Sequence, residues 1–388
     1  MIKRDLENQV IKAASQFPVV TITGPRQSGK STLCKMLFPE YGYVNLEAPD
    51  IRRFAMQDPR GFLRQFKGGA ILDEIQRCPE LPSYLQVMVD EDRTKGKWIL
   101  TGSQNLTLLE SISQSLAGRT AVLHLLPLSY NEVQRFEQYD TDLNEVIVTG
   151  GYPAILDQEV SPSDWHSSYV ATYIERDIRN ISKITDLAVF QRFVELCAGR
   201  TGQLLNLSSL AVDAGVSQPT AKAWINVLET SFIIFRLPPF FGNLRKRIVK
   251  MPKLFFYDSG LVCWLLGIRS AEQLISHPLR GAIFETWAIS EILKHRANKG
   301  VQAGTFFYRD SHGQEIDLVI DNGVQFTLIE AKAGQTISED TLKTSLKYGN
   351  VLGRTKPAKT IVVYGGEKLN TVDDIMFLPW DKISEQAW

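Results

Sequence analysis

The chain has 388 residues, of which 44% are hydrophobic and 22% are charged, and its formal net charge is zero. This balance is typical of a globular protein of two or three domains, and the zero net charge means that any nucleic-acid binding must come from a local basic patch. The four cysteines lie far apart without CxxC spacing, which argues against a disulfide framework and a cysteine zinc site. Since no signal peptide or membrane-spanning run is visible either, we expect a cytoplasmic protein without a membrane partner.

The first predicted element is a nucleotide-binding segment near the N-terminus. The stretch VVTITGPRQSGKSTL (19–33) reads as a strand, a loop with glycines at Gly24 and Gly29, and the start of a helix. Glycines let the backbone wrap phosphate oxygens, and the helix amides point at their charge. In this P-loop pattern Lys30 would reach the β- and γ-phosphates of ATP and Ser31 would hold Mg2+. The predicted nucleotide-binding residues of the loop are Gly24, Pro25, Arg26, Gln27, Ser28, Gly29, Lys30, Ser31 and Thr32.

Polar residues end two further predicted strands. The strand in GGAILDEIQ (68–76) ends in Asp73 and Glu74. At the end of a buried parallel strand, Asp73 would bind the Mg2+ shell and Glu74 would polarise the attacking water. The strand in KWILTGSQ (97–104) ends near Ser103, which either senses the γ-phosphate beside Glu74 or caps the chain locally.

Further strands, predicted at 43–46 and 121–126, alternate with helical segments. This alternation indicates a parallel sheet covered by helices on both faces. Arg119 lies just before the last of these strands, in SLAGRT (115–120). It is either an arginine finger for the γ-phosphate, acting in cis or from a neighbouring subunit, or an ordinary surface arginine.

The series GPRQSGKST, ILDEIQ, LTGS and LAGR resembles the AAA+-like branch of P-loop ATPases. This resemblance implies one strand between the P-loop strand and the strand that ends in Asp73 and Glu74. With GGYP (150–153), YIERDI (173–178) and FFYDSGL (255–261), the chain more narrowly resembles a widespread prokaryotic ATPase family. That resemblance implies an ATPase domain joined to a C-terminal region of unknown function, over nearly the whole chain.

Helical periodicity dominates from GGYP to about residue 200. In YVATYIERDIRN (169–180), Arg176 or Arg179 either reports the nucleotide state or belongs to a solvated helix face. Residues 206–237 then predict a helix, a sharp turn at Gly215 and a second helix, which is the signature of a helix-turn-helix motif.

Two wing strands are predicted after this motif, in FIIFRL (232–237) and RIVKMPKLFFYD (247–258), so the middle region resembles a winged helix. A run of basic residues without an intervening acid forms a local patch suited to a phosphate backbone: Arg236, Arg245, Lys246, Arg247, Lys250 and Lys253. The second helix itself is poor in arginine. DNA contact and a structural or interdomain role both remain open for this region.

The C-terminal part predicts a helix over 279–296 and strands at 305–310, 315–320 and 324–332. Between the last two strands, Asn322-Gly323 predicts a two-residue hairpin turn.

Carboxylates are expected to converge at one end of this hairpin. Side chains two apart on a strand share a face, so Glu330 and Lys332 point the same way, and the hairpin brings Asp317 close to Glu330. The preceding helix supplies Glu285. Converging carboxylates repel each other unless a divalent cation joins them, and a lysine beside them can stabilise a phosphorane-like transition state.

This set, a helix glutamate, then Asp317, then Glu330-x-Lys332, resembles the PD-(D/E)xK superfamily of RecB-like and restriction-type nucleases. The resemblance implies that Glu285 is the helix acid and that Asp317 and Glu330 hold Mg2+. Ile316 stands where a proline often precedes the first strand acid. Both an active metal-dependent nuclease and a nuclease-like fold without cleavage agree with these residues.

The predicted fold class is α/β, with a P-loop AAA+-like domain (1–153), a helical and winged-helix domain (154–270) and a restriction-endonuclease-like domain (271–388). We expect an ATPase that uses ATP and Mg2+ and acts on or binds DNA through residues 206–253 and the C-terminal domain. The alternative is a nucleotide-controlled regulatory switch that binds a protein partner, with the C-terminal domain as an inactive scaffold. A hexameric unfoldase or helicase is less favoured, because no pore loop is recognisable.

Overall fold

The computed structural model describes residues 2–103, 115–158, 160–174, 186–240, 250–310, 313, 315–336 and 356–388. They form two compact units: the first combines Met1–Leu128, Thr230–Phe232 and Arg296–Val301, and the second combines Ser129–Glu229, Ile233–His295 and Gln302–Trp388. The first unit thus ends earlier than the ATPase domain expected from the sequence, and the two later domains group together. Within the described ranges, no helix combines the length and the apolarity needed to span a membrane.

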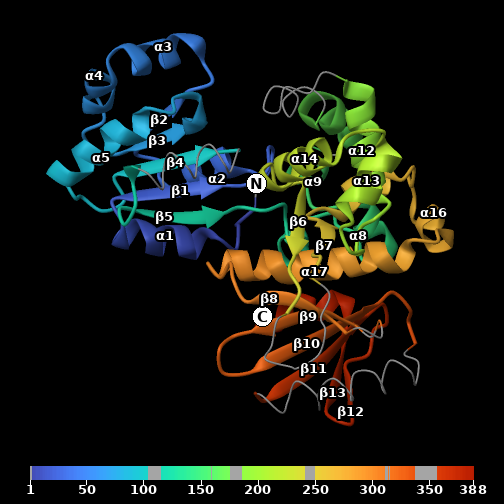
Figure 1. The fold of residues 1–388 in the computed structure, drawn as a ribbon. Helices are drawn as coiled ribbons and strands as arrows, with labels where there is room; N and C mark the ends of the chain where they lie inside the picture. Colours follow the sequence, from blue (N-terminus) through green and yellow to red (C-terminus); the bar gives the residue numbers. More distant parts are fainter. Residues whose placement is uncertain are drawn as a thin grey trace. The chain divides into compact units, whose positions relative to one another are not determined.

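A five-stranded parallel sheet forms the centre of the first unit (Figure 1), in the order β2-β3-β4-β1-β5. Its strands are β1 (Val19–Thr23), β2 (Gly42–Asn45), β3 (Ala70–Asp73), β4 (Trp98–Gly102) and β5 (Thr120–His124). One strand, β4, separates β1 from β3, as the resemblance implied. Because every pairing in this sheet is parallel, the carboxyl ends of the strands meet at one edge.

Helices cover both faces of this sheet. Val19 of β1 packs in one apolar cluster with Leu85, whereas the next residue, Val20, packs in a second cluster with Val10. The helices are α1 (Glu7–Gln16) and α2 (Lys30–Leu37) on one face, and α3 (Pro49–Gln57), α4 (Pro59–Arg64) and α5 (Leu81–Glu91) on the other, with the 3-10 turn η1 (Ile75–Arg77) after β3. The expected parallel sheet with two covered faces is confirmed.

The second unit begins with a helical part. Its helices are α7 (Tyr130–Val133), α8 (Leu143–Thr149), α9 (Pro153–Asp157), α10 (Pro162–Tyr169), the π-helical turn η2 (Val170–Ile174), α12 (Leu187–Ala198), α15 (Ser259–Leu265) and α16 (Ala271–Ser276). Asp258 anchors the GGYP segment, because its Oδ2 accepts a hydrogen bond from the Gly151 amide at 2.7 Å. Arg176 and Arg179 lie outside the described residues.

The helix pair expected in the middle region is present as α13 (Leu207–Ala214) and α14 (Gln218–Thr230). Gly215 turns the chain with a φ of 74°, a left-handed conformation that glycine adopts without steric cost. The strands β6 (Ile234–Leu237) and β7 (Lys253–Phe256) follow and pair antiparallel. The second of them is shorter than the stretch 247–258 expected from the sequence.

The basic patch expected around these strands is wrong in part. Lys253 is only 2% exposed, and Arg236 forms an ion pair with Glu229. Lys250 is exposed. The other three members, Arg245, Lys246 and Arg247, lie outside the described residues. Burial of Lys253 removes it from any surface offered to a phosphate backbone.

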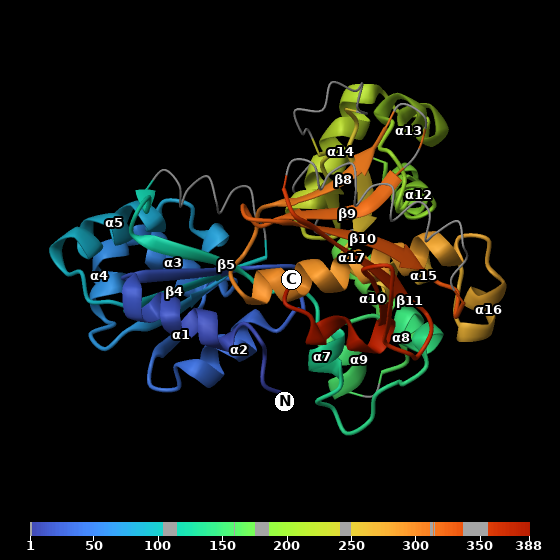
Figure 2. The same ribbon diagram turned by 90° about the horizontal axis from the view of Figure 1, so that it is seen from below.

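A six-stranded mixed sheet forms the rest of the second unit, in the order β12-β13-β11-β10-β9-β8. Its strands are β8 (Thr305–Arg309), β9 (Glu315–Asp321), β10 (Phe326–Lys332), β11 (Ala358–Tyr364), β12 (Asn370–Val372) and β13 (Ile375–Pro379), followed by the 3-10 turn η3 (Trp380–Glu385). The long helix α17 (Arg280–Asn298) runs between this sheet and the helical part (Figure 1 and Figure 2). β9 and β10 are antiparallel, whereas β10 and β11 are parallel.

The turn between β9 and β10 is longer than predicted. Asp321 pairs with Phe326, so residues 322–325 form a four-residue loop instead of a two-residue Asn-Gly turn. The Asn322 side chain organises this loop by accepting a hydrogen bond from the Gln325 amide at 2.8 Å. An asparagine side chain that mimics a backbone acceptor in this way favours the wider turn.

Candidate functional site

The P-loop connects β1 to α2 at the carboxyl edge of the first sheet. Gly24 has a φ of 152°, and a Cβ at this position would lie 2.1 Å from the backbone oxygen of Leu125. Gly29 has a φ of 93° and directly precedes α2. Gln27, between them, also adopts a left-handed backbone with a φ of 61°. These conformations bend the chain so that the loop and the first amides of α2 can face an anion.

Lys30 folds its side chain back over this loop. Its Nζ donates to the carbonyl oxygens of Pro25 at 2.7 Å and Gly24 at 3.0 Å. Burial lowers the pKa of Lys30 to about 8, although the carboxylates of Glu74 and Asp73 oppose that shift. The ammonium group is therefore held at the loop by neutral carbonyl oxygens. Charged phosphate oxygens would be stronger hydrogen-bond acceptors for it.

Asp73, at the end of β3, is 5% exposed and is surrounded by hydroxyl groups. Its Oδ2 accepts hydrogen bonds from Ser31 Oγ at 2.7 Å and from the Tyr43 hydroxyl at 2.6 Å, and its Oδ1 accepts one from Thr101 Oγ1. A serine hydroxyl beside a carboxylate is an oxygen donor pair of the kind that Mg2+ prefers. The contacts of Tyr43 and Thr101 with Asp73 could not be predicted, because nothing in the short strands that carry them signals the contact.

Glu74 follows Asp73 with a φ of 56°, a left-handed conformation that is uncommon for a residue with a side chain. Its Oε2 accepts hydrogen bonds from Ser103 Oγ at 3.2 Å and from Gln76 Nε2. Ser103 therefore lies beside Glu74, which agrees with the first of the two alternatives for this serine.

The donor set of this edge fits a bound nucleotide with Mg2+. Ser28 Oγ is buried and, among the residues that the structure describes, has no hydrogen-bond partner. A phosphate oxygen at the loop would satisfy such a hydroxyl. Thr32 is exposed in the first turn of α2, and Arg26 lies 3.6 Å from Glu47. No feature of these loop residues conflicts with an anion at this place.

Arg4 is a further residue of this site that was not predicted from the sequence. It is 6% exposed, and its guanidinium group donates to the carbonyl oxygen of Ser28 at 2.6 Å and to that of Leu126 at 2.9 Å. It thereby joins the P-loop to the chain that follows β5. No motif surrounds Arg4 in the sequence, and the stretch before α1 reads as an ordinary N-terminus.

Replacement of this arginine should loosen the loop. Arg4→Met removes charge-assisted hydrogen bonds from two buried carbonyls, so we expect the free energy of unfolding to fall by about 2–4 kcal/mol and the Kd for ATP to rise about tenfold. Denaturant unfolding and calorimetry measure the two changes. Arg60→Met, at an exposed position of α4, serves as the control and should stay within about 0.5 kcal/mol of wild type. Wild-type stability and affinity in Arg4→Met would show that Arg4 does not position the loop.

Arg119 lies away from the P-loop edge. It directly precedes β5, and Val19 and Thr120 are paired at the amino ends of their strands. Its guanidinium group holds Asp90 through two hydrogen bonds, of 2.8 Å and 2.9 Å. A finger acting in cis would have to reach the opposite edge of the sheet, so this placement speaks against that alternative. An action on a neighbouring subunit stays a prediction.

A second constellation lies in the second unit and brings together two acids predicted from the sequence, Glu285 and Asp317, with Glu315, which was not predicted as a site residue. Carboxylate oxygens of Glu285, Glu315 and Asp317 lie within 4.8 Å of one another. Asp317 also accepts a hydrogen bond from the Ala331 amide at 2.9 Å, which ties β9 to β10 beside Glu330. Glu285 therefore lies close to Asp317, and the role of these acids together with Glu330 stays a prediction.

Glu330 is the most confined acid of this constellation. Burial raises its pKa well above the ordinary value, the neighbouring Asp317 adds to that shift, and Lys332, 3.1 Å away, opposes it. Its Oε1 is buried and has no hydrogen-bond partner in the described part of the chain. The Asp317–Glu330 pair therefore offers two carboxylates, one with a free lone pair, to a divalent cation.

Lys253 enters the same constellation from β7, a contact that was not predicted from the sequence. Its Nζ lies 2.7 Å from Glu285 Oε1, contacts Glu315 Oε1 and lies 4.0 Å from Asp317 Oδ1. Burial alone would lower the pKa of Lys253, but the three carboxylates outweigh it and raise the pKa above the ordinary value. Its stretch of sequence predicted a surface patch, and only the folded chain brings it to the acids.

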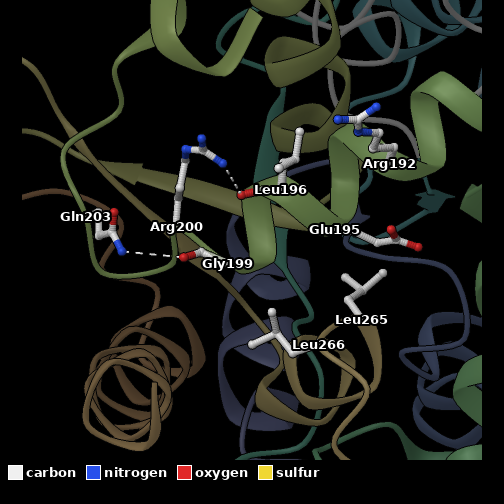
Figure 3. Close-up of a pocket in the computed structure, with 8 residues that line it drawn as sticks. All are labelled: Arg192, Glu195, Leu196, Gly199, Arg200, Gln203, Leu265 and Leu266. Atoms are coloured by element: carbon white, nitrogen blue, oxygen red, sulfur yellow. Dashed lines mark hydrogen bonds between the residues drawn. The ribbon is translucent and has the colours of Figure 1, made fainter. Parts of the chain in front are cut away.

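A cavity of about 670 Å³ lies between the end of α12 and the end of α15 (Figure 3), and it contains none of the predicted site residues. Figure 3 shows Arg200 turned toward the backbone of Leu196, whose carbonyl oxygen is 3.0 Å away. Arg200 also pairs with Asp213. The guanidinium group of Arg200 is thus already hydrogen-bonded within the chain. This cavity therefore adds no group to either constellation.

Comparisons with known proteins agree with a nucleotide site in the first unit. Residues 16–134 match a family described as a AAA domain, whereas residues 140–272 and 280–383 match two families described as domains of unknown function, DUF8612 and DUF4143. An uncharacterized protein of Mycobacterium tuberculosis is 28% identical over 98% of this chain and 84% of its own length. An uncharacterized protein of Methanocaldococcus jannaschii is 21% identical over 96% of this chain and 88% of its own length.

Among solved structures, a Walker-type ATPase of Pyrococcus abyssi is 16% identical, with a TM-score of 0.43 over 68% of this chain and 96% of that one. The domain match, rather than this distant likeness, identifies the first unit. The chain carries an N-terminal P-loop domain of the AAA type, which implies nucleotide binding. A helical region and a mixed-sheet domain follow it.

Proposed function

We propose that this protein hydrolyses ATP and uses the resulting cycle to control a C-terminal domain that acts on or grips DNA. For the ATPase step, Lys30 would contact the β- and γ-phosphates, Ser31 and Asp73 would hold Mg2+, and Glu74 would orient the attacking water. The observation that supports these roles is the hydrogen bond of 2.7 Å between Ser31 and Asp73, beside the buried Lys30. Ser103, in contact with Glu74, would sense the γ-phosphate.

For the C-terminal domain we propose a nuclease-like fold with one divalent cation at Asp317 and Glu330. The observation that carries this proposal is the buried, unpartnered Oε1 of Glu330 within the described residues, next to Asp317 and 3.1 Å from the Lys332 ammonium. A cation there would supply Lewis-acid chemistry to a phosphodiester. Lys332 would stabilise charge on the phosphate, and Glu285 would complete the acid set.

Cleavage of linear and single-stranded DNA tests this proposal. With Mg2+ or Mn2+ in the assay, we expect the wild type to cut and Asp317→Asn to lose more than about 10²-fold of the rate, because one carboxylate ligand is gone. Measurements with and without ATP show whether the ATPase regulates the cutting.

The matched control is Asp321→Asn on the same strand. Asp321 pairs with Lys356 at 2.8 Å and lies at the other end of β9, so its loss should leave the rate within about twofold of wild type. If wild-type protein that hydrolyses ATP cuts none of these substrates, the nuclease part of the proposal fails.

A second candidate is a nucleotide-controlled switch that binds a protein partner, with the C-terminal domain as an inactive scaffold. The observation that favours it is Lys253, which already neutralises part of the acid cluster. The helix α14 also offers few charges: of its exposed residues, Lys222 is the one cation in the described range 218–230. Salt-dependent DNA affinity separates the two candidates, since phosphate contacts release counterions.

A further inference from the structure

Lys253 is a buried lysine whose ammonium group lies among acidic and aromatic side chains. Its Nζ lies 5.7 Å from the ring centre of Phe255 and 5.9 Å from that of Phe307, so ring faces surround the end of the stem. The ammonium group then meets Glu285, Glu315 and, at 4.0 Å, Asp317. These contacts join the strand pair β6–β7 to the helix α17 and to the strand β9.

The three carboxylates that Lys253 contacts are the same three whose oxygens lie within 4.8 Å of one another. Three acids at this spacing would suit a divalent cation, which takes oxygen ligands at about 2.0–2.6 Å. The Lys253 ammonium already lies at hydrogen-bond distance from two of them. A metal ion at the same point would lose those oxygens to the lysine and would be repelled by its charge.

The Asp317–Glu330 pair differs from this cluster in the partners of its oxygens. Glu330 Oε1 has no partner among the described residues, and Lys332 reaches only the other oxygen, Oε2, at 3.1 Å. The side chain of Lys332 is 41% exposed, so it is far less enclosed than that of Lys253, which is 2% exposed. The acids thus form two parts. Lys253 already occupies the Glu285–Glu315–Asp317 cluster, whereas the Asp317–Glu330 pair keeps an oxygen available for a cation.

We propose that Lys253 is the resident cation of the Glu285–Glu315–Asp317 cluster, so that this cluster binds no metal. The divalent cation of the proposed nuclease-like site is then confined to Asp317 and Glu330, and this second clause rests on the function proposed above. The lysine belongs to the strand pair of the middle region. Neutralisation of the cluster therefore requires that the strand pair β6–β7 stays packed against α17 and β9.

Manganese binding to the full chain without nucleotide tests this inference. We expect Lys253→Met to bind one Mn2+ more than the wild type, as counted by electron paramagnetic resonance and calorimetry. Without the lysine, Glu285, Glu315 and Asp317 lose their shared cation, and Arg309 still pairs with the outer oxygen Oε2 of Glu315 at 3.3 Å, so Oε1 is left for the metal. The additional Glu315→Gln change should remove the extra ion. Mn2+ should also raise the melting temperature of Lys253→Met by more than that of the wild type.

Lys356→Met is the matched control. Lys356 pairs with the single carboxylate of Asp321 in the same domain, so its removal should leave the number of bound Mn2+ ions unchanged. If Lys253→Met fails to gain an ion while it remains folded, the inference is wrong.

The wild-type background keeps the test decisive if Lys253→Met does not fold. There, Glu315→Gln should change Mn2+ affinity by less than about twofold, because that acid pairs with lysine rather than with metal. A tenfold loss in Glu315→Gln would overturn the inference. Failure of the proposed nuclease site would appear differently, as a wild type without a Mn2+ site that depends on Glu330, and a gain of an ion in Lys253→Met would still uphold the role of Lys253.

Discussion

Lys30→Ala should abolish tight ATP binding. The ammonium group of Lys30 is buried against the carbonyl oxygens of Gly24 and Pro25, at the start of α2. A nucleotide would replace these neutral partners with charged phosphate oxygens, which attract the ammonium group through their charge in addition to accepting its hydrogen bonds. Loss of two or three such contacts should raise the Kd for ATP by about 10²-fold or more, and hydrolysis should fall below detection at working ATP concentrations.

Calorimetric titration with ATP and Mg2+ measures the affinity, and phosphate release measures the turnover. Lys12→Ala, at an exposed position of α1, is the matched control and should bind ATP like the wild type. Thermal unfolding without nucleotide checks that Lys30→Ala keeps its fold. Hydrolysis at the wild-type rate in Lys30→Ala would falsify the assignment of the nucleotide site.

The residues of the P-loop edge could be predicted because each one lies within a short, regular stretch of chain. A strand, two glycines and a helix start are all contained in 19–33. Asp73 is the last residue of β3 and Ser103 directly follows β4, so a parallel sheet alone places them at the same edge. The same rule could have decided against Arg119 as a finger acting in cis, because Arg119 precedes its strand and therefore lies at the opposite edge.

The predicted length of the loop between β9 and β10 was wrong, but the acids of the hairpin were still predicted to lie on the correct face of the sheet. A two-residue turn would place Leu328 opposite Asp317, whereas the observed register ends with Ile329 opposite Leu318, so that Glu330 comes next to Asp317. The two registers differ by two residues. Because side chains alternate with a period of two, such a shift keeps every side chain on its face of the sheet.

Contacts between distant parts of the chain could not be read from the sequence. Lys253 meets Glu285 across 32 positions, and Arg4 meets the carbonyl of Leu126 across 122. Each residue alone looks like a surface cation, since lysine and arginine are rarely buried without partners. Their partners depend on how whole elements pack, which local periodicity does not encode.

Glu74→Gln should separate ATP binding from ATP turnover. The glutamate lies one residue beyond Asp73, in a left-handed conformation with a φ of 56°, and its carboxylate contacts Ser103. Glutamine has the same shape and retains an oxygen that can accept the hydrogen bond from Ser103, so the loop and the affinity for ATP should persist. It is a far weaker base, and loss of a positioned base typically costs about 10²–10⁴-fold in rate.

Single-turnover hydrolysis, with ATP affinity measured on the same preparation, is the measurement. Glu80→Gln, an exposed glutamate in the same connection after β3, is the control and should turn over at the wild-type rate. An affinity within about threefold of wild type, together with a rate lowered by at least about 10²-fold, would assign water activation to Glu74. Equal turnover in Glu74→Gln would remove Glu74 from that role. The base would then have to be another group at the carboxyl edge, because the carboxylate of Asp73 is already occupied by three hydroxyl donors.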